Sequence, residues 1–161
     1  MLCASLLLTT LLTQQPLVPP ESQTLFTTSM KGENIDGLLA ELETATAGLT
    51  YISEQDHPLE PFAWRDFNGT LNRETVCRLT GHQTDEPVET VDFDWFFRNA
   101  VRDDLYGPEA AARFRVLKQL MRENLTNLKV YRVGRISLDV YVVGRTRGGT
   151  WMGLHTKVVE T

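Results

Sequence analysis

Apolar residues recur at helical spacing in two segments of the chain, and each segment carries its own boundary signals. The first runs from Ile35 to Leu42 with apolar steps of three and four residues, which places those side chains on one face of an α-helix. Asn34 is a good N-cap for this helix, and Gly48 suits the position after its end. The second segment runs from Pro108 to Asn124, and a proline is well tolerated in the first turn of a helix. The pattern therefore predicts two amphipathic helices.

Shorter elements are predicted between these two helices. Asn72 can cap a helix over residues 73–80, and Asp92 can cap another that runs through residues 95–97. Runs of apolar and aromatic residues also predict three short strands, at 49–53, 62–67 and 88–91.

The last third of the chain is predicted to be an antiparallel meander. Turn signals at Gly134-Arg135 and at residues 147–149 separate three strands. The expected strands span residues 129–133, 138–144 and 151–160.

The middle strand indicates that both faces of the sheet are covered. Leu138, Val140 and Val142 point one way. The opposite set, which includes Tyr141 and Val143, is not polar either. The sequence thus predicts an α+β domain with a mostly antiparallel sheet that ends in a C-terminal three-strand meander, with helices packed on the sheet.

Residues 1–29 differ in composition from the rest. They contain no Lys or Arg and one acid, Glu21, and they combine an apolar run over residues 2–12 with three prolines. A secretory signal, a disordered or weakly helical tail, and a mis-set start with Met30 as the initiator all remain open. The apolar run is too short to span a bilayer. We expect residues 1–29 to be a non-domain extension, residues 30–161 to be the domain, and no membrane to be involved.

The net charge of the chain favours a basic protein over nucleic acid as the partner. The net charge is -5 and the pI is about 5.2. An acidic surface repels phosphate backbones, which disfavours direct nucleic-acid binding. It attracts a basic protein instead, such as one that itself binds nucleic acid.

The chain carries few signals of chemistry. It lacks phosphate-loop, dinucleotide-binding, zinc-protease and serine-hydrolase motifs. His57, His82 and His155 lie in separate segments without metal-ligand spacing, and we interpret each as a surface or structural histidine. The two cysteines do not form a disulfide framework, which favours a reducing compartment, and Cys77 is expected to be a buried, inert thiol. We therefore expect no cofactor and no metal site of its own.

The acidic pairs of the chain do not by themselves distinguish a functional site from structural or solvated residues. Glu54 and Asp56, Asp92 and Asp94, and Asp103 with Asp104 are spaced as acid–base or metal-binding pairs can be. An N-cap and a solvated turn explain such residues equally well. Composition and spacing alone indicate an acidic α+β domain that binds a partner.

Five separated motifs carry a more specific signal. They are GLTYISEQDHP at 48–58, LTGHQTD at 79–85, VDFDWFF at 91–97, VYRVGRISLDVYVVG at 130–144 and HTKVVET at 155–161. In this order and spacing the chain resembles the nuclease A inhibitor-like family over roughly residues 35–161. His155 stands where the family pattern has a serine.

The resemblance implies an α-β-α sandwich that acts as a non-enzymatic inhibitor. The implied partner is a sugar-non-specific endonuclease that uses magnesium, and the inhibitor blocks its active site. Interface residues carried over by motif are Glu54 after the first strand, the mid-chain pair Asp104 and Leu105 with Tyr106 next, and the terminal Thr161. Glu54 and Thr161 would approach the partner's metal.

Two departures from the family pattern bear on the target. Leu105 replaces the family's tryptophan, and the chain is several residues shorter between Tyr106 and Phe114. Tryptophan is a favoured interface anchor and leucine is not. The alternative is a binding module on the same scaffold with a different hydrolase or toxin-like partner. For an inhibitor that protects its own cell we expect a cytoplasmic monomer that forms a one-to-one complex.

Overall fold

The structure of the chain is a computed structural model, and it describes residues 34–160. The predictions that concern residues 1–29 and Thr161 lie outside the described residues.

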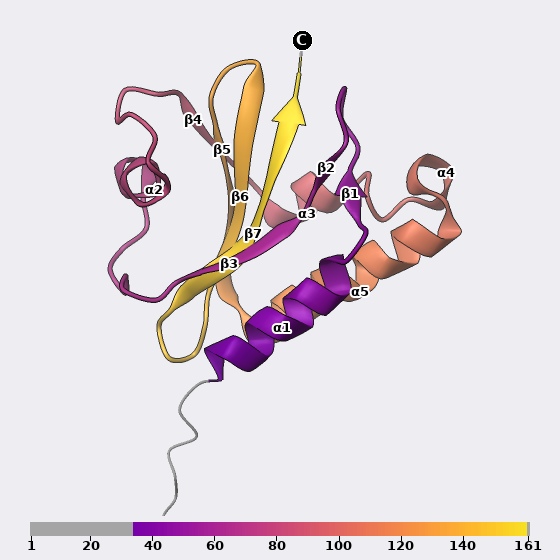
Figure 1. Ribbon diagram of the computed structural model, residues 1–161, viewed down its shortest axis with the longest axis horizontal. Coiled ribbons are helices and arrows are strands. Elements are labelled where there is room, and N and C mark those ends of the chain that lie inside the picture. The colour runs from indigo at the N-terminus through magenta and orange to yellow at the C-terminus, as the bar shows by residue number, and fades with distance from the viewer. Residues whose placement is uncertain (1–33, 161) are drawn as a thin grey trace, which may run out of the picture. The chain divides into compact units, whose positions relative to one another are not determined.

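A five-stranded antiparallel sheet with the strand order β3-β7-β6-β5-β4 forms the centre of the fold (Figure 1). Its strands are β3 (Glu60–Trp64), β4 (Val88–Val91), β5 (Thr126–Val133), β6 (Ser137–Arg145) and β7 (Trp151–Val159). A separate small hairpin consists of β1 (Thr50–Tyr51) and β2 (His57–Pro58). The helices are α1 (Ile35–Thr46), α2 (Arg73–Thr80), α3 (Phe93–Phe97), α4 (Asp103–Tyr106) and α5 (Pro108–Asn124).

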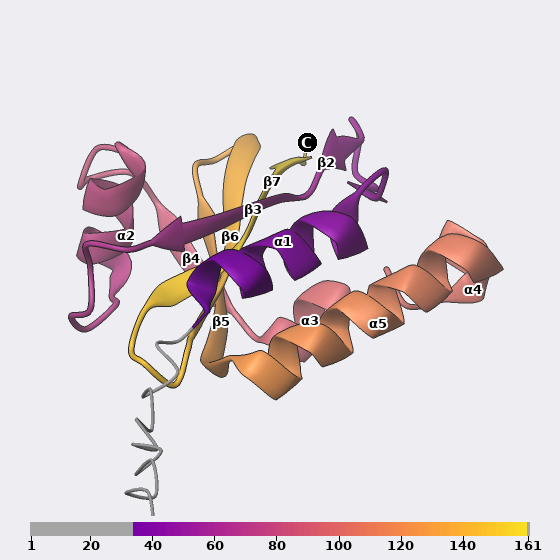
Figure 2. The same cartoon turned by 60° about the horizontal axis from the view of Figure 1, so that its bottom comes forward.

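Helices α1, α3 and α5 cover one face of the sheet (Figure 2). Fully buried residues of α5, such as Phe114 and Leu117, pack there against Val140 and Val142 of β6. Phe97 of α3 is also fully buried, and its ring contacts those of Phe93, Phe96 and Phe114. The expected apolar faces of the two long helices therefore form the main core.

Helix α2 covers the other face. Val76 and Cys77 of α2 are buried in a second cluster with Tyr131, Val143 and Trp151 from the sheet. Both faces of β6 are therefore covered, as its sequence predicted, and the α-β-α sandwich is confirmed. Cys77 is a buried free thiol, and burial raises its pKa.

Two local predictions were wrong. A solvated turn was one explanation for Asp103 and Asp104, but they begin the one-turn helix α4, where acidic residues interact favourably with the positive end of the helix dipole. The strand expected at 62–67 is β3, which ends at Trp64. Trp64 pairs with Trp151, the first residue of β7, so the partner strand does not extend further.

We expect Phe97→Ala to lower the free energy of unfolding by about 3–5 kcal/mol, because the substitution leaves a cavity among packed rings. Urea unfolding followed by tryptophan fluorescence measures the change. Val116→Ala is the control, because Val116 is 64% exposed, and it should change stability by less than about 0.5 kcal/mol. Equal effects of the two substitutions would contradict the assigned core.

A second prediction concerns alkaline pH. Burial, with a further contribution from the charge of Asp139, raises the pKa of Tyr141 from 10.0 to about 12. The folded chain then holds this proton more tightly than the unfolded chain, so the contribution is present below pH 10 and is lost as pH rises toward 12. The urea midpoint should fall across this range, and Tyr141→Phe should make the fall shallower. An unchanged slope in the variant would contradict this assignment.

Candidate functional site

Three segments meet at one end of the sheet. They are the loop of the small hairpin (residues 52–56), the β5–β6 turn (residues 134–136) and the last residues of β7 with Glu160. Because β5, β6 and β7 form a meander, the β5–β6 turn and the end of β7 lie at the same end of the sheet, and Figure 1 shows the hairpin beside them. We call these three segments the terminal surface.

Hydrogen bonds from two backbone N–H groups join the three segments. The N–H of Val159 donates to Oγ of Ser53 at 3.3 Å, and the N–H of Glu160 donates to the carbonyl oxygen of Ile136 at 3.0 Å. Successive residues at the end of β7 therefore bind the hairpin loop and the β5–β6 turn. Thr161 follows directly in sequence but lies outside the described residues.

Glu54 lies in the hairpin loop and is exposed. The neighbouring Ser53 makes a turn-like contact, in which its Oγ donates to the carbonyl oxygen of Gln55 at 2.6 Å. The loop that carries Glu54 is thus held by Ser53 both internally and against β7.

Tyr106 joins α4 to the same loop. Its Oη accepts the N–H of Ile52 at 2.8 Å, and its ring contacts that of Phe114 edge-on, with 5.1 Å between centroids. Burial raises the pKa of Tyr106, so the hydroxyl is neutral at physiological pH. The structure therefore brings Tyr106, of the three predicted residues in α4, into contact with the hairpin loop.

Asp104 and Leu105 are both exposed on α4. The carboxylate of Asp104 accepts two hydrogen bonds from Arg102, at 3.0 and 2.5 Å. These bonds hold its pKa below the ordinary value and raise that of Arg102. Leu105 is 48% exposed. Asp104 is thus a carboxylate already engaged by a cation.

A buried arginine beneath the terminal surface escaped the sequence-based prediction. Arg132 of β5 is only 9% exposed, and its guanidinium contacts Glu89 at 2.6 Å and Glu160 at 2.5 Å. Glu89 lies directly across from it on β4. Arg132 alternates with buried Tyr131 and Val133 in a covered strand. A charge in such a strand needs charged partners, so the arginine in this apolar segment was the sequence feature that could have indicated the site.

Tyr51 fixes the base of the hairpin on α3. Its ring stacks on that of Phe96 with 4.5 Å between centroids, and its hydroxyl donates to the carbonyl oxygen of Phe96 at 3.1 Å. Burial is the main cause that raises the pKa of Tyr51 to about 12. The hairpin is therefore attached to the core, to α4 and to β7.

His82 and His155 lie on the side of the sheet that α2 covers, and both contact the carboxylate of Asp139. Asp139 contacts Nε2 of His155 at 2.8 Å and Nε2 of His82 at 3.7 Å. Nδ1 of His82 lies 3.0 Å from Glu86. Within residues 34–160, no group of three or more His, Cys, Asp or Glu side chains is arranged to hold a metal ion.

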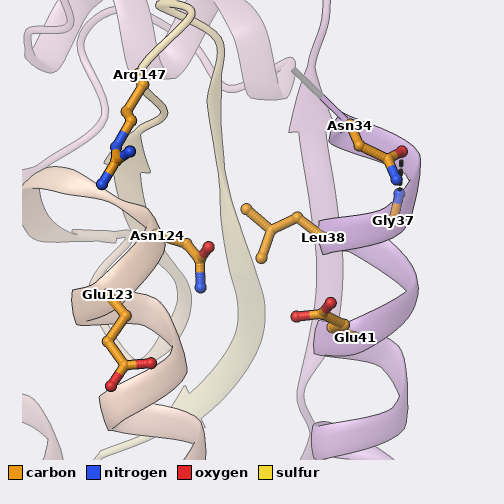
Figure 3. Close-up of a pocket in the computed structure, with 7 residues that line it drawn as sticks. All are labelled: Asn34, Gly37, Leu38, Glu41, Glu123, Asn124 and Arg147. Atoms are coloured by element: carbon orange, nitrogen blue, oxygen red, sulfur yellow. Dashed lines mark hydrogen bonds between the residues drawn. The ribbon is translucent and has the colours of Figure 1, made fainter. Parts of the chain in front are cut away.

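A hollow of about 460 Å³ between α1 and α5 contains further polar groups (Figure 3). Glu41 of α1 and Glu123 of α5 line it, with Arg147 from the β6–β7 turn. The side chain of Asn34 accepts the N–H of Gly37 and so caps α1. The β6–β7 turn lies at the sheet end opposite the terminal surface, so this hollow is separate from the predicted residues. None of the helices described for this chain is both long and apolar enough to cross a membrane.

Comparisons with known proteins address the identity of this fold. A search of curated proteins found no match. A protein-family comparison matches residues 36–161 to a family described as nuclease A inhibitor-like protein. The matched residues are well over half of the chain and include all the strands and the terminal surface. The chain therefore belongs to the nuclease A inhibitor-like family.

Proposed function

We propose that this chain is a protein inhibitor that binds and occludes the active site of a magnesium-dependent, sugar-non-specific endonuclease. Membership in the family supports an inhibitor role and a nuclease partner. The observation that carries the proposed mode of binding is the hydrogen bond between Val159 and Ser53, which holds the loop of Glu54 beside the end of β7.

The chemistry of the partner explains why acidic groups belong there. A nuclease site is basic because it holds phosphates, and magnesium takes hard oxygen ligands such as carboxylates. Glu54 would lie where phosphate oxygens bind, and Thr161, which follows Glu160, would enter the same site. The inhibitor itself performs no reaction and needs no cofactor.

Arg132 has a positioning role in this proposal. Its contact with Glu160 and the bond from Glu160 N–H to Ile136 fix the residue that precedes Thr161. Preorganising a binding segment lowers the entropy lost on association. The arginine therefore acts on affinity through the terminus without touching the partner.

A second candidate function is binding to a different hydrolase or a toxin-like protein. Leu105 favours it, because this exposed residue stands where the family pattern has tryptophan, and tryptophan is the stronger anchor. In either case we propose a cytoplasmic monomer that forms a one-to-one complex and does not bind nucleic acid directly.

The proposed function predicts stoichiometric inhibition. The full chain is titrated into a magnesium-dependent non-specific endonuclease of the ββα-metal type while plasmid cleavage is followed. Cleavage should stop near an equimolar ratio. Glu54→Gln should weaken binding by about 2–5 kcal/mol, because it removes an anchoring charge, and deletion of Thr161 should also weaken it.

Glu123→Gln is the matched control, since Glu123 lies in the hollow at the opposite end of the sheet, and it should inhibit like the wild type. Full cleavage in the presence of a large excess of the wild-type chain would reject this nuclease class as the target and favour the second candidate.

A further prediction tests the positioning role of Arg132. Arg132→Met and Glu160→Gln should each weaken inhibition by about tenfold or more, as expected for the loss of a hydrogen bond to a charged group. Because both remove one contact, their effects should not add in the double variant. Glu89→Gln removes only the other partner of Arg132 and should leave inhibition near that of the wild type. Additive losses, or an equal loss with Glu89→Gln, would show that Arg132 acts through general stability.

A further inference from the structure

Two isoleucines are exposed in the terminal surface. Ile136 in the β5–β6 turn is 65% exposed, and Ile52 in the hairpin loop is 47% exposed. Turns and loop tips favour glycine and small polar residues, each for its own conformational reason. A large aliphatic side chain at such a tip leaves apolar surface in water that binding could bury.

The backbone at both positions is held in place. The carbonyl oxygen of Ile136 accepts the N–H of Glu160, and the N–H of Ile52 donates to Oη of Tyr106. The turn before Ile136 is also fixed by Gly134, which has a φ of 118° and where an added Cβ would lie 2.6 Å from the carbonyl oxygen of Ser137. A backbone held in this way loses little conformational entropy when a partner covers it.

The two isoleucines flank the end of β7. Ile52 is next to Ser53, which binds Val159, and Ile136 binds Glu160 directly. The apolar side chains therefore lie on either side of the segment that leads to Thr161. Leu105, also exposed, follows on α4 beside Tyr106.

We propose that Ile136 and Ile52 are apolar anchors that pack against apolar side chains beside the basic active-site cleft of the nuclease, with Ile136 as the main one. This inference rests on the proposed function. Around a central charged contact, such side chains exclude water, which strengthens the interaction of Glu54 and the terminus with the cleft. The net charge of -5 supports a basic partner.

The same acidity explains why the apolar contact is needed. Charge attraction speeds encounter but is screened by salt, whereas apolar burial slows dissociation and is not screened in this way. Ile136 supplies that salt-resistant part of the affinity in a chain whose Leu105 stands where the family pattern has tryptophan.

The test compares Ile136→Ala with Ile136→Leu and Val116→Ala, each in the full chain. Val116, on α5 and outside the terminal surface, is 64% exposed and so matches Ile136 in exposure. Inhibition constants are measured by plasmid cleavage with the same ββα-metal endonuclease at low and high sodium chloride. Thermal unfolding of each variant is recorded in parallel.

We expect Ile136→Ala to raise the inhibition constant about tenfold, consistent with the loss of most of one buried aliphatic side chain. Ile136→Leu and Val116→Ala should remain close to the wild type. The factor lost with Ile136→Ala should be the same at both salt concentrations, and its melting temperature should match the wild type because the side chain is exposed.

If the wild-type chain inhibits and Ile136→Ala inhibits equally well, this inference is overturned and the proposed function stands. A loss that is matched by Val116→Ala, or that appears only with a lowered melting temperature, would overturn it as well. Failure of the wild-type chain to inhibit would overturn the proposed function and the inference together.

Discussion

The antiparallel pairing of β7 with β6 and β3 is the interaction on which the rest of the structure depends. β7 pairs with β6 from Ser137↔Val159 to Arg145↔Trp151, and its other edge pairs with β3. The side chains of the paired strands alternate between the two core clusters, so this register decides which residues face α1 and α5 and which face α2. The same register sets where β7 ends, and with it the position of the terminal surface.

The terminal surface is rigid because each of its parts is attached to the core by a different kind of contact. Tyr51 stacks on Phe96, Tyr106 accepts the N–H of Ile52, and Arg132 contacts Glu160. Each contact is modest alone, since a hydrogen bond in a protein contributes about 0.5–1.5 kcal/mol, or about 1.5–3 kcal/mol where one partner is charged. Their combined effect is to fix three short segments that would otherwise be mobile, which suits a protein that binds its partner without reacting.

Long amphipathic segments were predictable from the sequence because periodicity, caps and core packing agree there. This holds for α1, α5 and the three strands of the meander, and the motifs in these strands identified the family. The strand expected at 49–53 contains β1, whereas β2 has only two residues and therefore no alternation to predict it. Helix α4 is one turn held in place partly by the bond from Tyr106 to Ile52, a partner 54 positions away in sequence.

The residues of the candidate site also divide into those that the sequence predicted and those that it did not. Glu54 and Tyr106 were found through motifs, and the structure connects them through the hairpin loop. Arg132, Ile52 and Ile136 were missed. The charge of Arg132 in a covered strand signalled a need for partners but not which ones, and an isoleucine in or beside a strand is read as ordinary strand composition. Their meaning depends on exposure and on contacts between distant segments, which no local pattern contains.

The most direct test of the terminal surface as the inhibitory interface is NMR mapping of the isotope-labelled chain with an inactive variant of the endonuclease. Our account predicts that amide signals of residues 52–56, 134–136 and 158–161 shift or broaden on complex formation. Signals of α2 and of the hollow around Glu123 should stay unchanged. Perturbations centred on α2 or on that hollow, with the terminal surface unaffected, would contradict it.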